Sequence, residues 1–273
     1  WWESLRWGLE KMICCHGSLM TMAHCRPGTW RAAGNFLIAW RPKRQKPQAT
    51  SWFKKTCTNP EHVLKTDLTE RDNMKTIEAL KLVGGLSKPS KMPGWAYGIP
   101  AAECKTGGKL KLIPNSTCSG CYADKGCYVF PVVQAAQYRR LESIQHKDWV
   151  RAMVALINSK KSKWFRWHDS GDVQDVDHLE KIFTVARLTP ETKHWLPTRE
   201  AWTKDHLQNK PDNLVLRFSM PMIDQEAAAS WPNTSTVVSG SGRTCPAPDQ
   251  DNECKDCRAC WDPSVKNVAY GKH

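Results

Sequence analysis

The stretch Trp164-Phe165-Arg166-Trp167-His168-Asp169-Ser170-Gly171-Asp172 decides the fold class of this protein. Its first four residues are rich in aromatic side chains and predict a short strand, and the polar run after them marks where the strand ends. The segment Val176–Leu188 follows and repeats apolar residues at helical spacing until Thr189-Pro190 ends it. A strand that leads into a helix in this way indicates one βα unit of a parallel sheet.

Further strands and helices alternate on both sides of this unit. Strands are predicted at residues 109–113, 194–196, 213–218 and 236–238, and helices at 132–143, 147–158 and 201–207. Five strands that alternate with helices predict an α/β fold built on a parallel sheet, which is either open or a partial (β/α) barrel.

Polar side chains follow several of these strands. His168, Asp169 and Asp172 come after one predicted strand, and Arg199 and Glu200 come after the next. Functional sites of parallel α/β folds lie at the carboxyl ends of the strands. The sequence therefore predicts a site at this edge of the sheet.

The first of two cysteine groups lies in a loop. Cys118 and Cys121 are separated by two residues, so both thiolates can point at one metal, and Gly120 lets the backbone turn tightly between them. Cys104 or Cys127 would supply a third ligand, and the residues alone leave that choice open. A closed zinc site, an iron–sulfur cluster with one open iron and a redox-active pair are all compatible with this loop.

The second group is Cys245, Cys254, Cys257 and Cys260, four cysteines within sixteen residues. The segment has no apolar periodicity, so residues 241–273 are predicted to form a cysteine-rich, metal-binding C-terminal tail. Four thiolates suit zinc and a second iron–sulfur cluster equally well, and His273 could replace one ligand.

The chain of 273 residues carries a net charge of +13 and 12 cysteines, and both are unevenly distributed. Residues 1–73 hold four of the cysteines and show no lasting period, so they are predicted to be a non-core or disordered extension before an α/β body at 74–240. No apolar run reaches the length of about 18 residues that a membrane-spanning helix needs. Clustered thiols without a secretory signal indicate a reducing compartment, so a cytoplasmic protein is predicted.

The order of strand, Cys-x2-Cys-Tyr loop, helix, strand and Ser-Gly-Asp turn resembles the first half of a radical S-adenosylmethionine (SAM) enzyme. That resemblance implies a partial barrel of radical SAM type, in which three thiolates hold a [4Fe–4S] cluster, SAM binds the open iron and an external one-electron reductant starts its cleavage. It implies SAM contacts from Tyr122, Ser170, Gly171 and Asp172, and catalytic roles for His168, Asp169, Arg199 and Glu200. The sequence departs from that pattern in two places: no thiol lies four residues before Cys118, and Asp172 stands where the usual residue is Glu.

More closely, residues 115–128, 165–172, 197–200 and 257–262 are similar to the Gene product 88 family of tailed bacteriophages. This resemblance covers about residues 74–273 and implies a phage-encoded enzyme in the host cytoplasm. No substrate-binding motif appears in the sequence, so a nucleotide, a nucleic acid (through one of its bases) and a peptide are all compatible substrates.

The alternative hypothesis is a zinc-stabilised nucleic-acid-binding protein without catalysis. It is based on the excess of basic over acidic residues at 74–273, 28 against 21, and on Trp164, Trp167 and Trp195, which could stack on bases.

Overall fold

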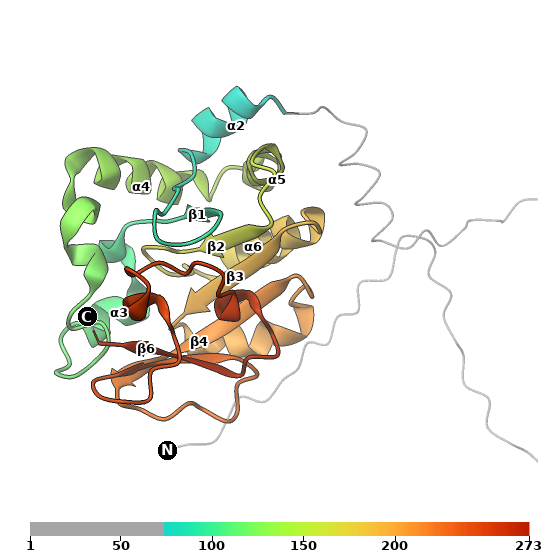
Figure 1. The fold of residues 1–273 in the computed structure, drawn as a ribbon. Coiled ribbons are helices and arrows are strands. Elements are labelled where there is room, and N and C mark those ends of the chain that lie inside the picture. Colours follow the sequence, from blue (N-terminus) through green and yellow to red (C-terminus); the bar gives the residue numbers. More distant parts are fainter. Residues whose placement is uncertain (1–73, 273) are drawn as a thin grey trace, which may run out of the picture. The chain divides into compact units, whose positions relative to one another are not determined.

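A computed structural model describes residues 74–272 (Figure 1). The predicted extension at 1–73 and the suggested ligand His273 lie outside these described residues. Six strands form one sheet: β1 (Trp95–Tyr97), β2 (Trp164–Trp167), β3 (Lys193–Thr198), β4 (Leu214–Ile223), β5 (Thr234–Val238) and β6 (Asn267–Gly271). Neighbouring strands all pair in parallel, and their order in the sheet is their order in the sequence.

Within the described residues β1 and β6 are the edge strands, so the sheet is open. The α-helices are α2 (Thr76–Val83), α3 (Lys105–Leu110), α4 (Pro131–Ser143), α5 (Trp149–Ser159) and α6 (Val176–Leu188). Short 3-10 helices lie at η1 (Ala101–Glu103), η2 (Tyr122–Asp124), η3 (Gly126–Val129), η4 (Ala201–Asn209), η5 (Ala247–Asp249) and η6 (Ala259–Trp261). The predicted α/β fold with a parallel sheet is confirmed, in its open form.

One face of the sheet is covered by helices. Helix α5 packs against α2 and α6, and the three helices form the hydrophobic core together with the sheet. Side chains alternate along β2, so Phe165 and Trp167 enter this core while Trp164 and Arg166 face the other way. This alternation gives the sheet a second face with different chemistry.

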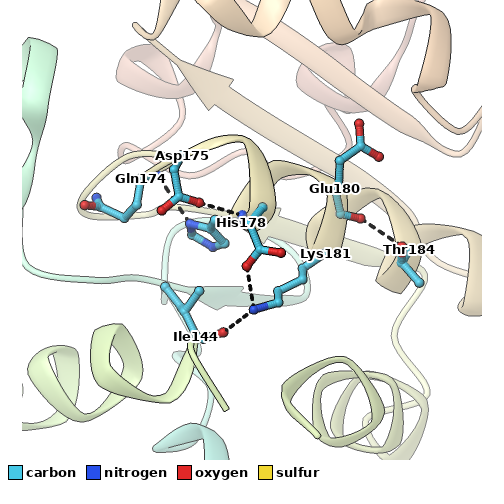
Figure 2. Close-up of polar contacts among 8 residues, drawn as sticks. Ile144, Gln174, Asp175, His178, Glu180, Lys181 and Thr184 are labelled. Carbon is cyan, nitrogen blue, oxygen red and sulfur yellow. Dashed lines mark hydrogen bonds and ion pairs between the residues drawn. The ribbon is translucent and has the colours of Figure 1, made fainter. Parts of the chain in front are cut away.

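Helix α6 begins next to the polar run that ends β2. The side chain of Asp175 caps it by accepting a hydrogen bond from the backbone N–H of His178 at 2.8 Å (Figure 2). Nδ1 of His178 accepts a bond from the backbone N–H of Gln174 at 3.3 Å, and Lys181 donates to the carbonyl oxygen of Ile144 at 2.8 Å. These bonds fix the helix relative to both the strand before it and the end of α4.

The C-terminal tail covers the face that the helices leave open. Helix η6 contacts β3 and β4, and the buried Trp261 packs edge-on against Trp164 and Trp195. Its indole N–H donates to the carbonyl oxygen of Phe165 at 2.9 Å. The tail then adds β6 to the sheet by pairing with β5. Packing against the sheet therefore stabilises this segment, in addition to any contribution from its cysteines.

One sequence prediction of secondary structure was wrong. Residues 109–113 are not a strand: α3 ends at Leu110, and Leu112 and Ile113 are exposed, so no apolar core lies beside them. The first strand is instead β1, which at three residues is too short to show a period. The helix predicted at 201–207 is confirmed and has 3-10 geometry, as η4.

Candidate cysteine site at the carboxyl edge of the sheet

The chain turns sharply after β2, and this turn positions the polar run. His168 has a φ of 53°, and Gly171 has a φ of 80°. A side chain at Gly171 would also place its Cβ 2.8 Å from the carbonyl oxygen of Ile99. The close approach of these two backbones brings the loop after β1 next to the loop after β2.

Asp172 lies at the centre of this edge. One carboxylate oxygen accepts the backbone N–H of Val173 at 2.7 Å, and the other accepts that of Arg199, after β3, at 2.8 Å. Burial raises the pKa of Asp172 to about 6, although these hydrogen bonds oppose the shift. Asp172 is therefore a buried carboxylate that carries its charge at neutral pH.

Three thiols lie near one another and near Asp172. Burial raises the pKa of Cys104 to about 12, and the charges of Asp172, Cys121 and Cys118 add to that shift. Gly107 in α3 leaves room between two of them, because a Cβ there would lie 3.7 Å from Sγ of Cys104 and 3.6 Å from Sγ of Cys118.

Cys127, the other candidate for the third ligand, differs from this group in its exposure. It is exposed in η3, whereas Cys118 is buried and Cys104 and Cys121 are half-buried. The structure thus brings Cys104, Cys118 and Cys121 together, and we call them the edge thiols.

Arg199 and Glu200 support the edge thiols from the end of β3. The Arg199 guanidinium donates to the carbonyl oxygens of Ser219 and Met220 at 3.1 and 2.8 Å. It also lowers the pKa of the Cys118 thiol, although burial has the larger effect and the net shift is upward. Arg199 therefore places a positive charge beside one thiol of the group.

The Glu200 carboxylate is engaged by hydrogen bonds. It accepts the backbone N–H of Thr106 at 3.0 Å, the Thr106 hydroxyl at 2.9 Å and the indole N–H of Trp202 at 3.0 Å. Because Thr106 is two residues beyond Cys104, Glu200 fixes the segment that carries this thiol.

The predicted SAM contacts Tyr122 and Ser170 have protein partners. The Tyr122 hydroxyl donates to the carbonyl oxygen of Asp169 at 2.6 Å and accepts a bond from Arg166 at 3.0 Å. The Ser170 hydroxyl is buried and donates to the carbonyl oxygen of Ile99 at 2.8 Å. Both hydroxyls hold the loops of the edge together.

His168 and Asp169 are buried differently from the edge thiols. The His168 ring packs edge-on against His178 of α6, with 5.2 Å between ring centroids, and neither ring nitrogen has a hydrogen-bond partner. Burial lowers the pKa of His168 well below its usual value. Burial raises the pKa of Asp169, and its Oδ1 has no partner. The structure therefore places His168 against the helical layer and not with the edge thiols.

The four tail cysteines form a second group. Burial raises the pKa of Cys254, and the neighbouring Cys245 and Cys257 add to the shift. Burial also raises the pKa of Cys260 to about 11, and its sulfur lies 3.1 Å from the hydroxyl of Tyr270 on β6. Between residues 74 and 272, no group of three or more His, Cys, Asp or Glu side chains has an arrangement that could hold a metal ion as it stands.

Two arginines on the strands belong to this region and were not among the predicted site residues. Arg217 of β4 is completely buried and donates to carbonyl oxygens of the tail and of β5 at residues Thr234, Ala259, Cys260, Asp262 and Val265. Arg166 of β2 lies on the same face of the sheet. A charged residue within a predicted buried strand is the signal that could have identified both.

These features define an α/β protein with an open parallel sheet and two thiol groups, one of them at the carboxyl edge of that sheet. The chain belongs to the Gene product 88 family, whose model matches residues 66–263. No curated protein and no solved structure matches the chain. None of the helices in the described part of the chain has the length and apolar character to cross a membrane.

Proposed function

We propose that this protein is an iron–sulfur enzyme of radical SAM type, which uses S-adenosylmethionine to modify a substrate. The observation that carries the proposal is the proximity of Cys104, Cys118 and Cys121 to one another and to Asp172 at the carboxyl edge of the sheet. The strands follow one another in sequence order, which is also the order in a partial (β/α) barrel.

The edge thiols have the composition that such a cluster requires. A closed zinc site uses four protein ligands, whereas the edge group offers three thiolates and Cys127 is exposed. Three thiolates on a cubane cluster leave one iron open to a small molecule. When bound there, the cluster and SAM would supply one-electron chemistry for hydrogen abstraction.

Asp172 is the residue best placed to receive the amino group of SAM. It is close enough to Cys104 to raise the pKa of that thiol, and it is ionised above about pH 6. Its two backbone hydrogen bonds fix the carboxylate, so little side-chain entropy is lost when a ligand binds.

Glu200 is proposed as a positioning residue. Its carboxylate accepts three hydrogen bonds from Thr106 and Trp202. These bonds fix the segment after Cys104. The tail cysteines are proposed to hold a second metal, either zinc or another iron–sulfur cluster. Arg217 fixes the backbone around Cys260 for that purpose.

The test is to purify the full chain without oxygen, reconstitute it with iron and sulfide, reduce it and measure the release of 5′-deoxyadenosine from SAM. Release by the wild-type protein and its loss in Cys118→Ala and Cys121→Ala are expected. Cys127→Ala, which removes an exposed thiol of the same loop, is the matched control and should retain the activity. A colourless protein that binds only zinc would contradict the proposal.

The alternative of a nucleic-acid-binding protein finds less support in the packing. Trp167 is completely buried in the core, and Trp164 and Trp195 both pack against Trp261. The indole rings on which the alternative relies are thus already in contact with protein. We therefore propose the enzyme.

A further inference from the structure

Arg166 is half-buried and differs from Arg217, the buried arginine on the same tail-covered face of the sheet. All three nitrogens of Arg217 donate to carbonyl oxygens. Arg166 donates to the Tyr122 hydroxyl at 3.0 Å, and a second nitrogen has only the sulfur of Met92 at 3.9 Å. Its Nε is buried and has no partner, and no carboxylate among residues 74–272 pairs with it.

A second unused donor lies beside it. The Arg166 guanidinium stands over the Trp195 ring, 4.6 Å from the centroid, and the buried indole N–H of Trp195 also has no hydrogen-bond partner. A buried donor without an acceptor costs free energy, and the cost is larger for a charged group. Two such donors, on paired residues of β2 and β3, indicate a place that an acceptor fills.

The surroundings of Arg166 favour an anion that is not part of the chain. The groups that raise its pKa, against the opposing effect of burial, include the hydroxyls of Tyr122, Tyr128 and Tyr270, which are neutral at pH 7, and the carboxyl of Asp169. Asp169 acts from beyond ion-pair distance and is itself a buried group with a raised pKa. The positive charge of Arg166 is thus only partly offset.

The position of Arg166 is between the two thiol groups. It contacts Tyr122, which follows Cys121 directly in the chain, and its charge opposes the burial that raises the pKa of both Cys254 and Cys260 in the tail. A ligand anchored here would lie on the tail-covered face of the sheet, next to the edge at which the edge thiols meet.

We propose that Arg166, together with the indole N–H of Trp195, receives an anionic group, a carboxylate or a phosphate, of the substrate. The planar guanidinium fork suits both groups through paired hydrogen bonds. Naming the ligand a substrate rests on the proposed function, whereas the binding of an anion at Arg166 does not.

The experiment measures the thermal shift of the full-length protein with pyrophosphate and with malonate, against sodium chloride at equal ionic strength. A rise in Tm is expected for the wild type and for Arg139→Gln, which removes an exposed arginine of α4. The rise should be lost in Arg166→Gln and reduced in Arg166→Lys, which keeps the charge without the fork. An equal rise in Arg166→Gln would overturn the proposal. If Arg166→Gln does not fold, an unchanged rise in Arg166→Lys would overturn it.

Two further measurements distinguish this proposal from other roles of Arg166 and from the proposed function. Metal content is measured in each variant, because loss of metal in Arg166→Gln would make Arg166 a counter-ion of the tail thiolates and would also overturn the proposal. The shift is measured again with saturating S-adenosylhomocysteine, and it should persist; its loss would assign the anion to the carboxylate of SAM. Anion binding by a chain that forms no cluster would refute the proposed function and leave the anion site standing.

Discussion

The carboxylate of Asp172 accepts a hydrogen bond from the backbone N–H of Arg199 at 2.8 Å, and this bond joins the loop after β2 to the end of β3. It fixes a buried negative charge beside Cys104 and keeps the Arg199 side chain near Cys118. The relationship explains why residues from two loops, far apart in the sequence, act on the same thiol group.

The affinity for SAM should depend on the charge of Asp172. Burial raises the pKa of its carboxyl to about 6, so the anion that would pair with the amino group of SAM is lost as the pH falls through about 6. We expect the affinity of the reconstituted protein for SAM to rise between about pH 5 and pH 7 and then level off. Equilibrium binding of labelled SAM measures this, and Asp172→Asn should bind weakly at every pH. An unchanged affinity in that variant would remove Asp172 from the site.

Gly107 and the neighbouring Gly108 provide a matched pair in α3. A Cβ at Gly107 would lie 3.1 Å from Cβ of Cys104 and within 4 Å of two sulfurs, whereas a Cβ at Gly108 meets no atom within 4 Å. Gly108→Ala should therefore stabilise the helix by up to about 1 kcal/mol and leave iron binding intact. Gly107→Ala should reduce the iron bound per chain. Equal iron content in the two variants would show that the space at Gly107 is not needed.

The protein should lose stability in mild acid. Burial lowers the pKa of His178 and of His194 to about 3, so both rings are neutral in the folded state and take up protons on unfolding below about pH 6.5. The stability they contribute is complete above that pH and decreases as the pH falls, by about 2 kcal/mol for each ring at pH 5. Urea unfolding of the wild type and of His178→Gln measures this.

In His178→Gln the pH dependence of the free energy of unfolding should be smaller. His146→Gln, at an exposed position, is the control and should keep the slope of the wild type. Identical slopes in all three proteins would mean that His178 is not buried in its neutral form.

Arg217→Met should be strongly destabilising. The guanidinium donates to five backbone carbonyls, four of them between residues 259 and 265 of the tail, and methionine would leave these acceptors unsatisfied. We expect a loss of about 3 kcal/mol or more in the free energy of unfolding, together with loss of any metal in the tail. Arg139→Met, on the surface of α4, should change stability by no more than about 0.5 kcal/mol. A similar small change in Arg217→Met would contradict this role.

The sheet was largely predictable because its signals are local. Strands such as β2 and helices such as α6 carry their own period and their own end signals, and so their existence followed from the sequence. The three-residue β1 carries no period, and β6 lies within the segment at 241–273, which shows no apolar period. Both strands depend on their neighbours in the sheet.

The sequence predicts which residue types form the candidate site, but it does not predict which of these residues contact one another. The spacing of Cys118 and Cys121 indicates a thiol pair, but the choice between Cys104 and Cys127 depends on how α3 folds back onto the edge of the sheet. The use of Glu200 to hold Thr106 depends on the same folding, 94 residues apart in the chain. Contacts of that range are set by tertiary packing, which no local pattern encodes.

The most direct test of the account is the iron content of the anaerobically reconstituted full chain in Cys104→Ala and in Cys127→Ala. We predict that Cys104→Ala loses the iron of one cubane cluster, about four atoms per chain, together with its visible absorption. Cys127→Ala should retain the iron content of the wild type. Loss of the cluster in Cys127→Ala with retention in Cys104→Ala, or the absence of iron from the wild-type protein, would contradict the account.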